Sequence, residues 1–372
     1  MDIDPLLGAL SAALNGQGPA VEILPGSAPG SHRVERAADA PEGSAAVVRT
    51  SGSTGTPKRT VLPIDALAAS SMATAEYLRT EGQWLLALPV HYVAGLAVLT
   101  RSLYAGTRPW AMDLGAPFTA ERFTAAAAEL TDRVRITSLV PTQLARLLRD
   151  PAPDTIAALR RFNAILLGGG ATSEALRAAA RSHGLRVIRT YGMSETCGGC
   201  VYDGDPLPGV RLSLDAGRIR LGGDVVAGGY LGNPELTAAH FSVGGDGTRW
   251  FTTDDVGTLA DGVLEVGGRI DDVINTGGIK VSAGTVAAAI EAVPGVGSAL
   301  VVGLDDPEWG TSVGALVTGT ADPEAIRAAV RTAWGGPAVP RTLLQVTELP
   351  TLPGGKPDRR AAISLLGAAG RE

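Results

Sequence analysis

One stretch of the sequence reads as a complete strand–turn–helix–strand unit, and this unit restricts the chain to folds with a parallel sheet. Residues 164–167 are Ala-Ile-Leu-Leu, a short apolar run typical of a buried strand, and three glycines follow at 168–170. Residues 173–183 form an amphipathic helical pattern, and residues 185–189 give the next strand. Two strands joined through a helix normally pair in parallel, so the sequence predicts an α/β fold.

The same alternation recurs earlier in the chain, and a different pattern follows it. Residues 84–88 and 134–140 are strand-like, and an Ala-rich helical stretch at 121–130 separates them. From about residue 200 the sequence changes to short strands with many glycines, at 218–230 and 250–268. This change predicts a small β-rich subdomain of meanders or a barrel.

The last part of the sequence has a compact α+β pattern. It contains a helix near 284–293, strands at 298–304 and near 313–318, and a helix near 323–334. We therefore predict a large N-terminal domain at 1–268, with layered, mostly parallel sheets and helices plus the β-rich subdomain, and a small C-terminal domain at 269–372. A length of 372 residues fits two domains of ordinary size.

Charge and hydropathy exclude several classes of partner. The net charge of −6 argues against nucleic acid or an anionic membrane as a main partner. No stretch approaches the roughly 18 apolar residues of a spanning helix, and the start, MDIDPLLGAL, lacks the basic region of a signal peptide. We expect a cytoplasmic protein without membrane insertion that acts on small molecules, and a homodimer is one possible assembly.

Cys197 and Cys200 form an isolated Cys-x-x-Cys pair. A zinc site would need two further Cys or His ligands, and the four histidines are scattered along the chain. A redox pair is one interpretation. The other, which we favour, is two small reduced residues in a tight glycine-containing loop, because free Cys packs as a small hydrophobe.

The distribution of lysine is unusual and points to phosphate. The chain has only three lysines, Lys58, Lys280 and Lys356, and each lies in or beside a glycine-rich turn. Lysine provides a compact cation on a flexible stem, and such a cation beside exposed backbone N–H groups is a common way to hold phosphate. Chance placement is the alternative, since glycine-rich loops are common in this sequence.

The segment TSGSTGTPK at residues 50–58 is the strongest candidate for a phosphate site. Its glycines expose backbone N–H groups, and its hydroxyls and Lys58 add further donors, which together form an anion cradle. It is not a Walker A loop, because Pro57 stands where Gly is needed before the Lys and Arg59 where Ser or Thr is needed after it. An ordinary Ser/Gly linker is the alternative.

Two further motifs offer groups for a nucleotide. YGMSET at 191–196 follows a predicted strand, so Tyr191 can stack on a base and Glu195 can hold a hydrated Mg²⁺. Alternatively, Glu195 is a solvated loop carboxylate. Asp255 and Arg269 offer an acceptor and a donor for ribose hydroxyls, although such a pair is also a common surface salt bridge.

Taken in order, five motifs resemble the adenylate-forming superfamily of acyl-CoA synthetases, luciferases and peptide-synthetase adenylation domains. They are TSGSTGTPK (50–58), YGMSET (191–196), TTDD (252–255), GRIDDVINTGG (268–278) and PGGKPDR (353–359). Two departures stand out: Arg59 replaces the usual Gly, and the usual Thr-Gly-Asp reads Thr253-Asp254-Asp255. The chain also looks short at its N-terminus for this superfamily, so we expect a minimal first subdomain.

Within the superfamily, the chain looks most like the o-succinylbenzoate–CoA ligases of menaquinone biosynthesis in their compact actinobacterial form. The segments that carry this narrower resemblance are SLVPTQL (138–144), GGGA (168–171) and YGMSETCGGCVYDG (191–204). It implies a reaction in two steps. A carboxylate and ATP give an acyl-adenylate and pyrophosphate, and the thiol of coenzyme A then displaces AMP.

The resemblance also implies roles for individual residues. Lys356 would stabilise the charge that develops at the α-phosphate, and Glu195 with Thr54 would hold Mg²⁺. Asp271 would be the hinge of a mobile C-terminal domain, and Lys280 would lie near the same face. The expected ATP and coenzyme A contacts are Thr50, Ser51, Gly52, Ser53, Thr54, Gly55 and Lys58 for phosphate, Gly169, Gly170, Tyr191, Gly192 and Ser194 around adenine, Asp255 and Arg269 for ribose, and Gly277 and Gly278 for pantetheine.

For the acid, Arg101 is the most informative residue. It interrupts an apolar helical stretch at 95–104, and burying a charge without a partner is costly. Arg101 therefore either reaches solvent along its aliphatic stem or meets an anion, for which the distal carboxylate of o-succinylbenzoate is the implied candidate. The other expected contacts with the acid are His91, Ser138, Thr142 and Gly192.

Four competing functions would require different sequence features. A hydrolytic P-loop NTPase needs the Gly-Lys-Ser/Thr sequence that is absent at 57–59. A peptide-synthetase-type enzyme would make the same adenylate and transfer it to a carrier protein. A non-catalytic adenylate-binding paralogue would have no need of Lys356. A related ligase or adenylation enzyme for another aryl or alkyl acid is the remaining alternative.

Overall fold

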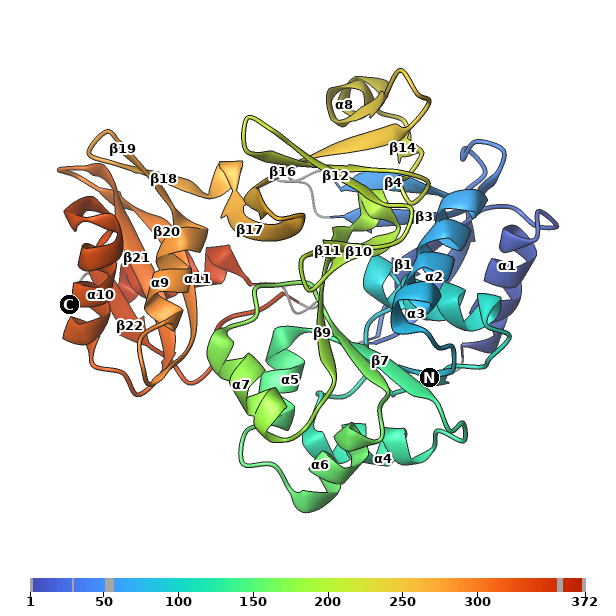
Figure 1. Ribbon diagram of the computed structural model, residues 1–372, viewed down its shortest axis with the longest axis horizontal. Coiled ribbons are helices and arrows are strands. Elements are labelled where there is room, and N and C mark those ends of the chain that lie inside the picture. The colour runs from blue at the N-terminus through green and yellow to red at the C-terminus, as the bar shows by residue number, and fades with distance from the viewer. Residues whose placement is uncertain (1–2, 29, 51–56, 353–356, 370–372) are drawn as a thin grey trace.

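The computed structural model describes residues 3–28, 30–50, 57–352 and 357–369, apart from the side chain of Asp271. Figure 1 shows a large lobe that runs from the N-terminus to strand β17, and a smaller lobe that contains the remaining strands and helices. Alternating strands and helices build most of the large lobe, so the predicted α/β class is confirmed. The predicted boundary at 268–272 falls where β17 ends and the short 3-10 helix η2 (Ile270–Asp272) begins.

A sheet of seven strands forms the centre of the large lobe, in the order β11-β10-β9-β8-β7-β5-β6. Strands β6, β5, β7, β8 and β9 run parallel, and β10 and β11 complete the sheet in antiparallel pairing. The bounds are β5 Gln83–Leu86, β6 Trp110–Ala111, β7 Arg135–Leu139, β8 Ala164–Leu167, β9 Val187–Met193, β10 Gly198–Tyr202 and β11 Asp205–Pro206.

Side-chain alternation along these strands explains why helices cover both faces of the sheet. Leu85 belongs to one hydrophobic core, whereas its neighbours Trp84 and Leu86 belong to another, as a period of two residues requires. The core around Leu85 is covered by α4 (Ala120–Ala128), α5 (Pro141–Leu147), α6 (Pro153–Arg160) and α7 (Glu174–Ser182). Helices α2 (Ile64–Leu78) and α3 (Val93–Tyr104) cover the opposite face.

The predicted strand–turn–helix–strand unit is β8, the following glycine turn, α7 and β9. Ser173 caps α7 by accepting a hydrogen bond from the backbone N–H of Leu176. Strand β9 is longer than the sequence indicated, because Tyr191 and Gly192 pair with the antiparallel strand β10. The first part of YGMSET is therefore strand, and η1 (Ser194–Thr196) follows it.

A second sheet lies beyond α2 and has the order β14-β4-β3-β1-β2. Helix α1 (Asp4–Leu14) contacts β3, and α2 contacts β4 (Figure 1). The sequence did not predict this sheet or the helices α1 and α2. The strand bounds are β1 Val21–Pro25, β2 His32–Arg36, β3 Ser44–Thr50, β4 Lys58–Pro63 and β14 Gly229–Tyr230.

The β-rich part predicted after residue 200 is a third sheet, ordered β12-β13-β16-β15, with β17 paired to β16. Glycine turns close its antiparallel hairpins, as the sequence pattern indicated. Helix α8 (Pro234–His240) packs beside it. The strand bounds are β12 Arg211–Asp215, β13 Arg218–Gly222, β15 Phe241–Val243, β16 Arg249–Ala260 and β17 Val263–Arg269.

The small lobe has its own core and the predicted α+β composition. Val286, Ile290, Val301 and Ile326 are buried in that core, which α9 and α10 share with the β20–β21 hairpin. Within the described residues, none of the helices combines the length and apolar character that crossing a membrane requires. The bounds are β18 Val273–Thr276, β19 Ile279–Ser282, α9 Ala283–Glu291, β20 Val296–Asp306, β21 Gly310–Gly319, α10 Pro323–Trp334, η3 Gly336–Ala338, β22 Thr342–Gln345 and α11 Arg359–Ala369.

A cluster of charges fixes the hairpin of β3 and β4. Glu22 on β1 is only 3% exposed and accepts hydrogen bonds from Arg49 (2.7 Å) and from two nitrogens of Arg59 (2.9 and 3.1 Å). Arg59 also donates to Asp39. Burial acts to raise the pKa of Glu22, but the hydrogen bonds from Arg59 and Arg49 outweigh it, so this pKa lies below its usual value.

We expect Glu22→Gln to lower the free energy of unfolding by about 2 kcal/mol at neutral pH, because two guanidinium groups lose a charged acceptor. Urea unfolding measures this change. Glu35→Gln is a matched control, since the pair of Glu35 with Arg33 is exposed and should contribute at most about 0.5 kcal/mol. Equal losses in the two variants would contradict the role of Glu22.

The same comparison has a predicted pH dependence. A carboxyl group whose pKa is lower in the folded state stabilises the protein above its unfolded pKa. The advantage of the wild type over Glu22→Gln should therefore be complete above pH 4.5, the ordinary pKa of Glu22, and should disappear as the pH falls through the lowered value. An advantage that stays constant down to about pH 3 would exclude a contribution from the Glu22 charge.

Candidate active site

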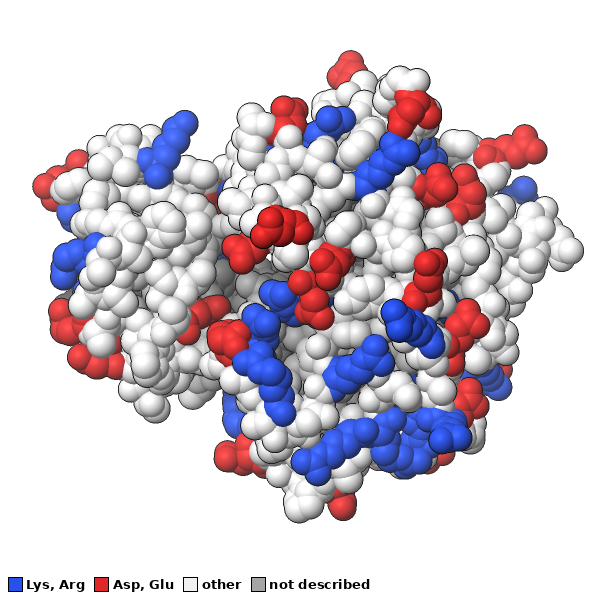
Figure 2. All heavy atoms as spheres, in the orientation of Figure 1, with Lys and Arg blue, Asp and Glu red and all other residues white. Residues whose placement is uncertain are grey.

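A cavity of about 310 Å³ lies at the carboxyl edge of the seven-stranded sheet. Residues at or just after the ends of β5, β7, β8 and β9 line it, including Pro89, Ser138, Gly169 and Gly192. Ligands of open α/β sheets bind at this edge because the loops after parallel strands converge there. On the face shown in Figure 2, the surface is hollowed where the two lobes meet, and acidic and basic side chains surround the hollow.

The predicted phosphate segment begins at the end of β3 and ends at the start of β4. Thr50 and Lys58 face each other at the end of the hairpin, and both line the cavity. The Nζ of Lys58 lies 5.2 Å from the centre of the Tyr230 ring. Five of the predicted phosphate contacts lie outside the described residues: Ser51, Gly52, Ser53, Thr54 and Gly55.

Glu195, the predicted metal-binding carboxylate, lies in the wall of the cavity. It lies in η1 directly after β9, is 8% exposed, and lines the cavity together with Ser194. The hydroxyl of Tyr230 donates a 2.8 Å hydrogen bond to Oε1 of Glu195, whereas no contact occupies its second oxygen in the described part of the chain. One free carboxylate oxygen suits Mg²⁺, which often takes one or two protein carboxylates together with substrate phosphates.

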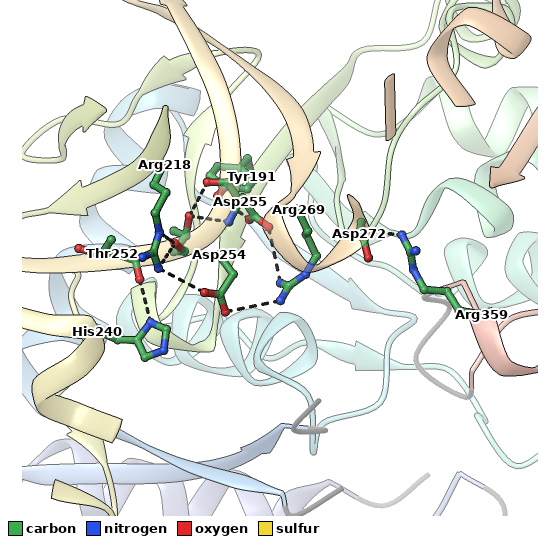
Figure 3. Close-up of polar contacts among 10 residues, drawn as sticks. Tyr191, Arg218, His240, Thr252, Asp254, Asp255, Arg269, Asp272 and Arg359 are labelled. Carbon is green, nitrogen blue, oxygen red and sulfur yellow. Dashed lines mark hydrogen bonds and ion pairs between the residues drawn. The ribbon is translucent and has the colours of Figure 1, made fainter. Parts of the chain in front are cut away.

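Five side chains form a network of hydrogen bonds and ion pairs (Figure 3), of which Asp254, Asp255 and Arg269 line the cavity, whereas Tyr191 and Arg218 do not. Tyr191 donates a 2.7 Å hydrogen bond to Asp255, which also lies 3.6 Å from a nitrogen of Arg269. Asp254 links Arg269 (3.6 Å) to Arg218 (3.2 Å). Burial first, and then the negative charge of Asp255, raise the pKa of Tyr191 far above its usual value, so Tyr191 acts as a donor.

The glycines predicted at adenine occupy the strand ends. Gly169 lines the cavity, and Gly170 follows it in the turn but does not line it. Gly192 also lines the cavity, and a Cβ there would lie 2.1 Å from the carbonyl oxygen of Gly198. Position 192 therefore requires glycine because β9 and β10 approach each other closely.

Arg101, on α3, is buried and lines the cavity. It is 7% exposed, donates a 3.2 Å hydrogen bond to the hydroxyl of Tyr202, and lies over the ring of Trp84. Its Nε has no hydrogen-bond partner, and no ion pair joins it to a carboxylate in the described part of the chain. Arg101 therefore does not reach solvent, and a buried guanidinium without a counter-ion suits an anionic ligand.

Of the other residues predicted to contact the acid, only some line the cavity. Ser138 lines the cavity, as Arg101 does, whereas His91 and Thr142 do not line it. His91 packs against the neighbouring ring of Tyr92, which does line the cavity, and burial followed by the nearby His32 lowers the pKa of His91. Direct contacts of His91 and Thr142 with the acid stay predictions.

The segment that carries the predicted catalytic lysine is only partly described, because Lys356 lies outside the described residues. Leu352, on its N-terminal side, lines the cavity. Thr351 pairs with Pro357 in an isolated β-bridge. Glu348, a little earlier, forms ion pairs with Arg146 (3.2 Å) and Arg149 (3.6 Å) of the large lobe.

The predicted hinge and pantetheine residues lie at the start of the small lobe. Asp272 forms an ion pair with Arg359 at the start of α11 (Figure 3). Gly277 has a φ of +57°, and a Cβ there would lie 2.4 Å from the ring of Trp309. Lys280, on β19, is exposed. The hinge role of Asp271 stays a prediction.

The two cysteines are free, and both are 1% exposed. Burial raises the pKa of Cys200 to about 12 and that of Cys197 further, so both thiols are protonated at neutral pH. Among residues 3–28, 30–50, 57–352 and 357–369, no cluster of three or more His, Cys, Asp or Glu side chains could hold a metal ion. A metal at this site would therefore depend on Glu195 and the ligand's phosphates.

Comparison with known families decides how the cavity is to be understood. The model of the AMP-binding enzyme family matches residues 9–225, and that of the AMP-binding enzyme C-terminal domain matches residues 285–356. The chain belongs to the AMP-binding enzyme family.

Individual proteins within this family are similar to the chain over most of its length. A probable 2-succinylbenzoate–CoA ligase of Mycobacterium tuberculosis is 44% identical over 370 residues, which cover 96% of this chain and 94% of the relative. An o-succinylbenzoate CoA synthetase from Bacillus subtilis, solved with its acyl-adenylate intermediate, matches with a TM-score of 0.70 and 25% identity, covering 85% of this chain and 68% of that one. ATP-bound MatB from Rhodopseudomonas palustris matches with a TM-score of 0.72 and 26% identity, covering 87% and 68%.

For this AMP-binding enzyme, the structure accounts for both departures from the superfamily pattern. Arg59, where Gly is usual, is held by Glu22 and Asp39 and points away from the cavity residues Thr50 and Lys58. Asp254, where Gly is usual, bridges Arg218 and Arg269 and so belongs to the network around Asp255.

Sequence reasoning missed several cavity residues of this AMP-binding enzyme. Tyr230, Tyr202 and Asp254 all make polar contacts with predicted site residues, yet no motif contained Tyr230. Tyr202 lies within the segment 191–204 that carried the narrower resemblance. Asp254 could have been found as an unexpected carboxylate within the TTDD motif.

Two adjacent glycines provide a stability test of the small lobe. Both Gly277 and Gly278 have positive φ, so alanine at either position should cost about 1 kcal/mol of backbone strain. Only at Gly277 would the new methyl group also overlap Trp309, which should add roughly 1–3 kcal/mol. Denaturant unfolding should therefore rank Gly277→Ala well below Gly278→Ala, and equal stabilities would refute the steric explanation.

Proposed function

We propose that the chain is an AMP-forming 2-succinylbenzoate–CoA ligase. The 44% identical relative, which the chain matches over nearly its whole length, supports this activity. The single structural observation that carries the substrate assignment is Arg101, a buried cation in the cavity wall without a carboxylate partner among the described residues. In the first half-reaction the acid attacks ATP and pyrophosphate leaves, and in the second the thiol of coenzyme A displaces AMP.

The first half-reaction must bring a carboxylate onto a polyanion. Two unit charges about 4 Å apart repel by roughly 4 kcal/mol at an effective dielectric constant of 20, so the site needs cations. Lys58, with the hydroxyl of Thr50, would bind the triphosphate, and Lys356 would stabilise the charge that develops at the α-phosphate. Mg²⁺, held by Glu195 and the predicted Thr54, would supply further positive charge at the β and γ phosphates.

The network around Asp255 suits a nucleoside. Asp255 can accept both ribose hydroxyls while Arg269 and Tyr191 hold its carboxylate in place. Gly169 leaves room against which adenine can lie, whereas Tyr191 lies behind the wall, where its hydroxyl binds Asp255. The contacts of Asp254 with Arg218 and Arg269 hold this wall rigid before ATP arrives.

The acid would lie along the apolar half of the cavity. Leu88, Val93 and Ala97 line this half and suit an aromatic ring. The distal carboxylate would then meet the guanidinium of Arg101, which Tyr202 orients through its hydroxyl. The reacting carboxylate would point toward the triphosphate, so the site would favour an acid with two separated carboxylates.

For the second half-reaction, coenzyme A would enter beside Gly277 and Gly278 after the small lobe rotates at the predicted hinge, Asp271. The ion pairs of Glu348 with Arg146 and Arg149 join the two lobes in the orientation described here, so rotation must break them. The cytoplasmic location and the homodimer stay predictions from the sequence.

The acid assignment makes a prediction about Arg101→Met. This variant keeps the volume of the side chain but removes its charge, so the KM for 2-succinylbenzoate should rise roughly 10- to 100-fold through the loss of a charge-assisted contact. An analogue without the distal carboxylate should be used equally by wild type and variant. Steady-state kinetics with both acids checks this, and parallel losses for the two would oppose the assignment.

The reaction type makes a separate prediction. ATP–pyrophosphate exchange should depend on added 2-succinylbenzoate, and the thioester should appear only when coenzyme A is also present. Lys356→Ala should lower the exchange rate at least 100-fold and leave ATP binding within a few-fold, since the lysine acts mainly on the transition state. If another acid of a panel supported exchange and 2-succinylbenzoate did not, the substrate assignment would be wrong, although the family assignment would still hold.

A further inference from the structure

Lys58 and Glu195 present opposite charges to the same cavity without pairing. Both line its wall, Glu195 is 8% exposed, and Lys58 is half-buried. Within the described part of the chain neither forms an ion pair. A half-buried ammonium and a buried carboxylate attract each other strongly, so something must hold them apart.

The side chain of Tyr230 lies between them. Its hydroxyl donates to Oε1 of Glu195 at 2.8 Å, and its ring face lies 5.2 Å below the Nζ of Lys58. Burial and then the charge of Glu195 raise the pKa of Tyr230 far above its usual value, so the hydroxyl remains a donor. A tyrosine can satisfy both charges at once because its hydroxyl binds anions and its ring face attracts cations.

The backbone around Tyr230 also joins the two elements that carry these charges. Tyr230 pairs with Thr60 on the strand that begins at Lys58, and the N–H of Leu231 donates to the carbonyl of Arg59 at 2.7 Å. On the other side, the N–H of Ala227 donates to the carbonyl of Glu195 at 2.9 Å. The segment from 227 to 231 therefore fixes the distance between η1 and β4.

Packing holds the ring itself in one orientation. Tyr230 is 5% exposed, and the ring of Phe241 meets it edge-on at 5.3 Å between centroids. The backbone N–H of Tyr230 donates to the hydroxyl of Thr237. A ring confined in this way cannot swing aside to let Lys58 reach Glu195.

We propose that Tyr230 is a positioning residue that keeps Lys58 and Glu195 apart, so that the ammonium remains available to the triphosphate and the carboxylate to the divalent cation. The inference rests on the proposed use of ATP, although not on the identity of the acid. If the two charges paired, each would be neutralised before the ligand arrived, and binding would have to break that pair.

The test is calorimetric titration of ATP into the full chain, with and without magnesium chloride at equal ionic strength and with no acid present. Tyr230→Phe keeps the ring under Lys58 but removes the hydrogen bond to Glu195. ATP affinity should then fall roughly tenfold with magnesium and stay within about twofold without it, because a hydrogen bond to a charged group is lost. Equal weakening under both conditions would overturn the proposal, as would no weakening.

Tyr230→Leu removes the ring as well, so Lys58 can pair with Glu195. ATP affinity without magnesium should then also fall, roughly tenfold, and the double variant Tyr230→Leu/Glu195→Gln should recover it because a neutral side chain no longer captures the lysine. A double variant as weak as the single one would overturn the spacer role. Should the leucine variants fail to fold in thermal melts, the phenylalanine comparison decides alone.

Tyr104→Phe is the matched control, since Tyr104 is 41% exposed at the end of α3 and lies outside the cavity wall. Its ATP affinity should equal that of the wild type under both conditions. The two proposals can fail separately. If the wild type does not bind ATP, the proposed function is refuted. If the wild type binds ATP and Tyr230→Phe binds it equally well under both conditions, only the positioning role of Tyr230 is refuted.

Discussion

The parallel pairing of β5, β7, β8 and β9 is the interaction on which the candidate site depends. Because these strands run in the same direction, their carboxyl ends meet at one edge, and the loops that follow them supply Pro89, Ser138, Gly169 and Gly192 to one cavity. Helices on both faces bury the sheet, so the edge is the part of it left open to a ligand. The other two sheets then bring charged residues to this edge.

The pairing of charged side chains is the second feature on which the candidate site depends. A site for a triphosphate and a dicarboxylic acid must keep cations ready without letting the protein's own carboxylates neutralise them. Arg49 and Arg59 form such a neutral cluster with Glu22 and Asp39 away from the cavity, and Arg218 pairs with Asp254, which lines the cavity. Lys58 and Arg101 remain without a carboxylate partner among the described residues, which is how a preorganised anion site is expected to look.

Much of this organisation could be predicted from the sequence, for physical reasons that differ between elements. Strand β8 and helix α7 were predicted nearly to the residue, because their apolar runs, glycine turn and Ser173 cap are local signals. The sheet β14-β4-β3-β1-β2 was not predicted, and its edge strand β14 pairs with β4, which is far away in the sequence. Tyr230 was missed because it meets Glu195 across 35 residues of sequence and carries no signal of that contact.

The sequence by itself determined the chemistry: which hydroxyls, lysines and carboxylates are present, and in which turns, since backbone preferences act over a few residues. Only the tertiary structure decided which of these groups meet. It buried Arg101 against Tyr202, tied Arg59 to Glu22, and set Tyr230 between Lys58 and Glu195. Those distances follow from packing and strand pairing between distant segments, and no local preference encodes them.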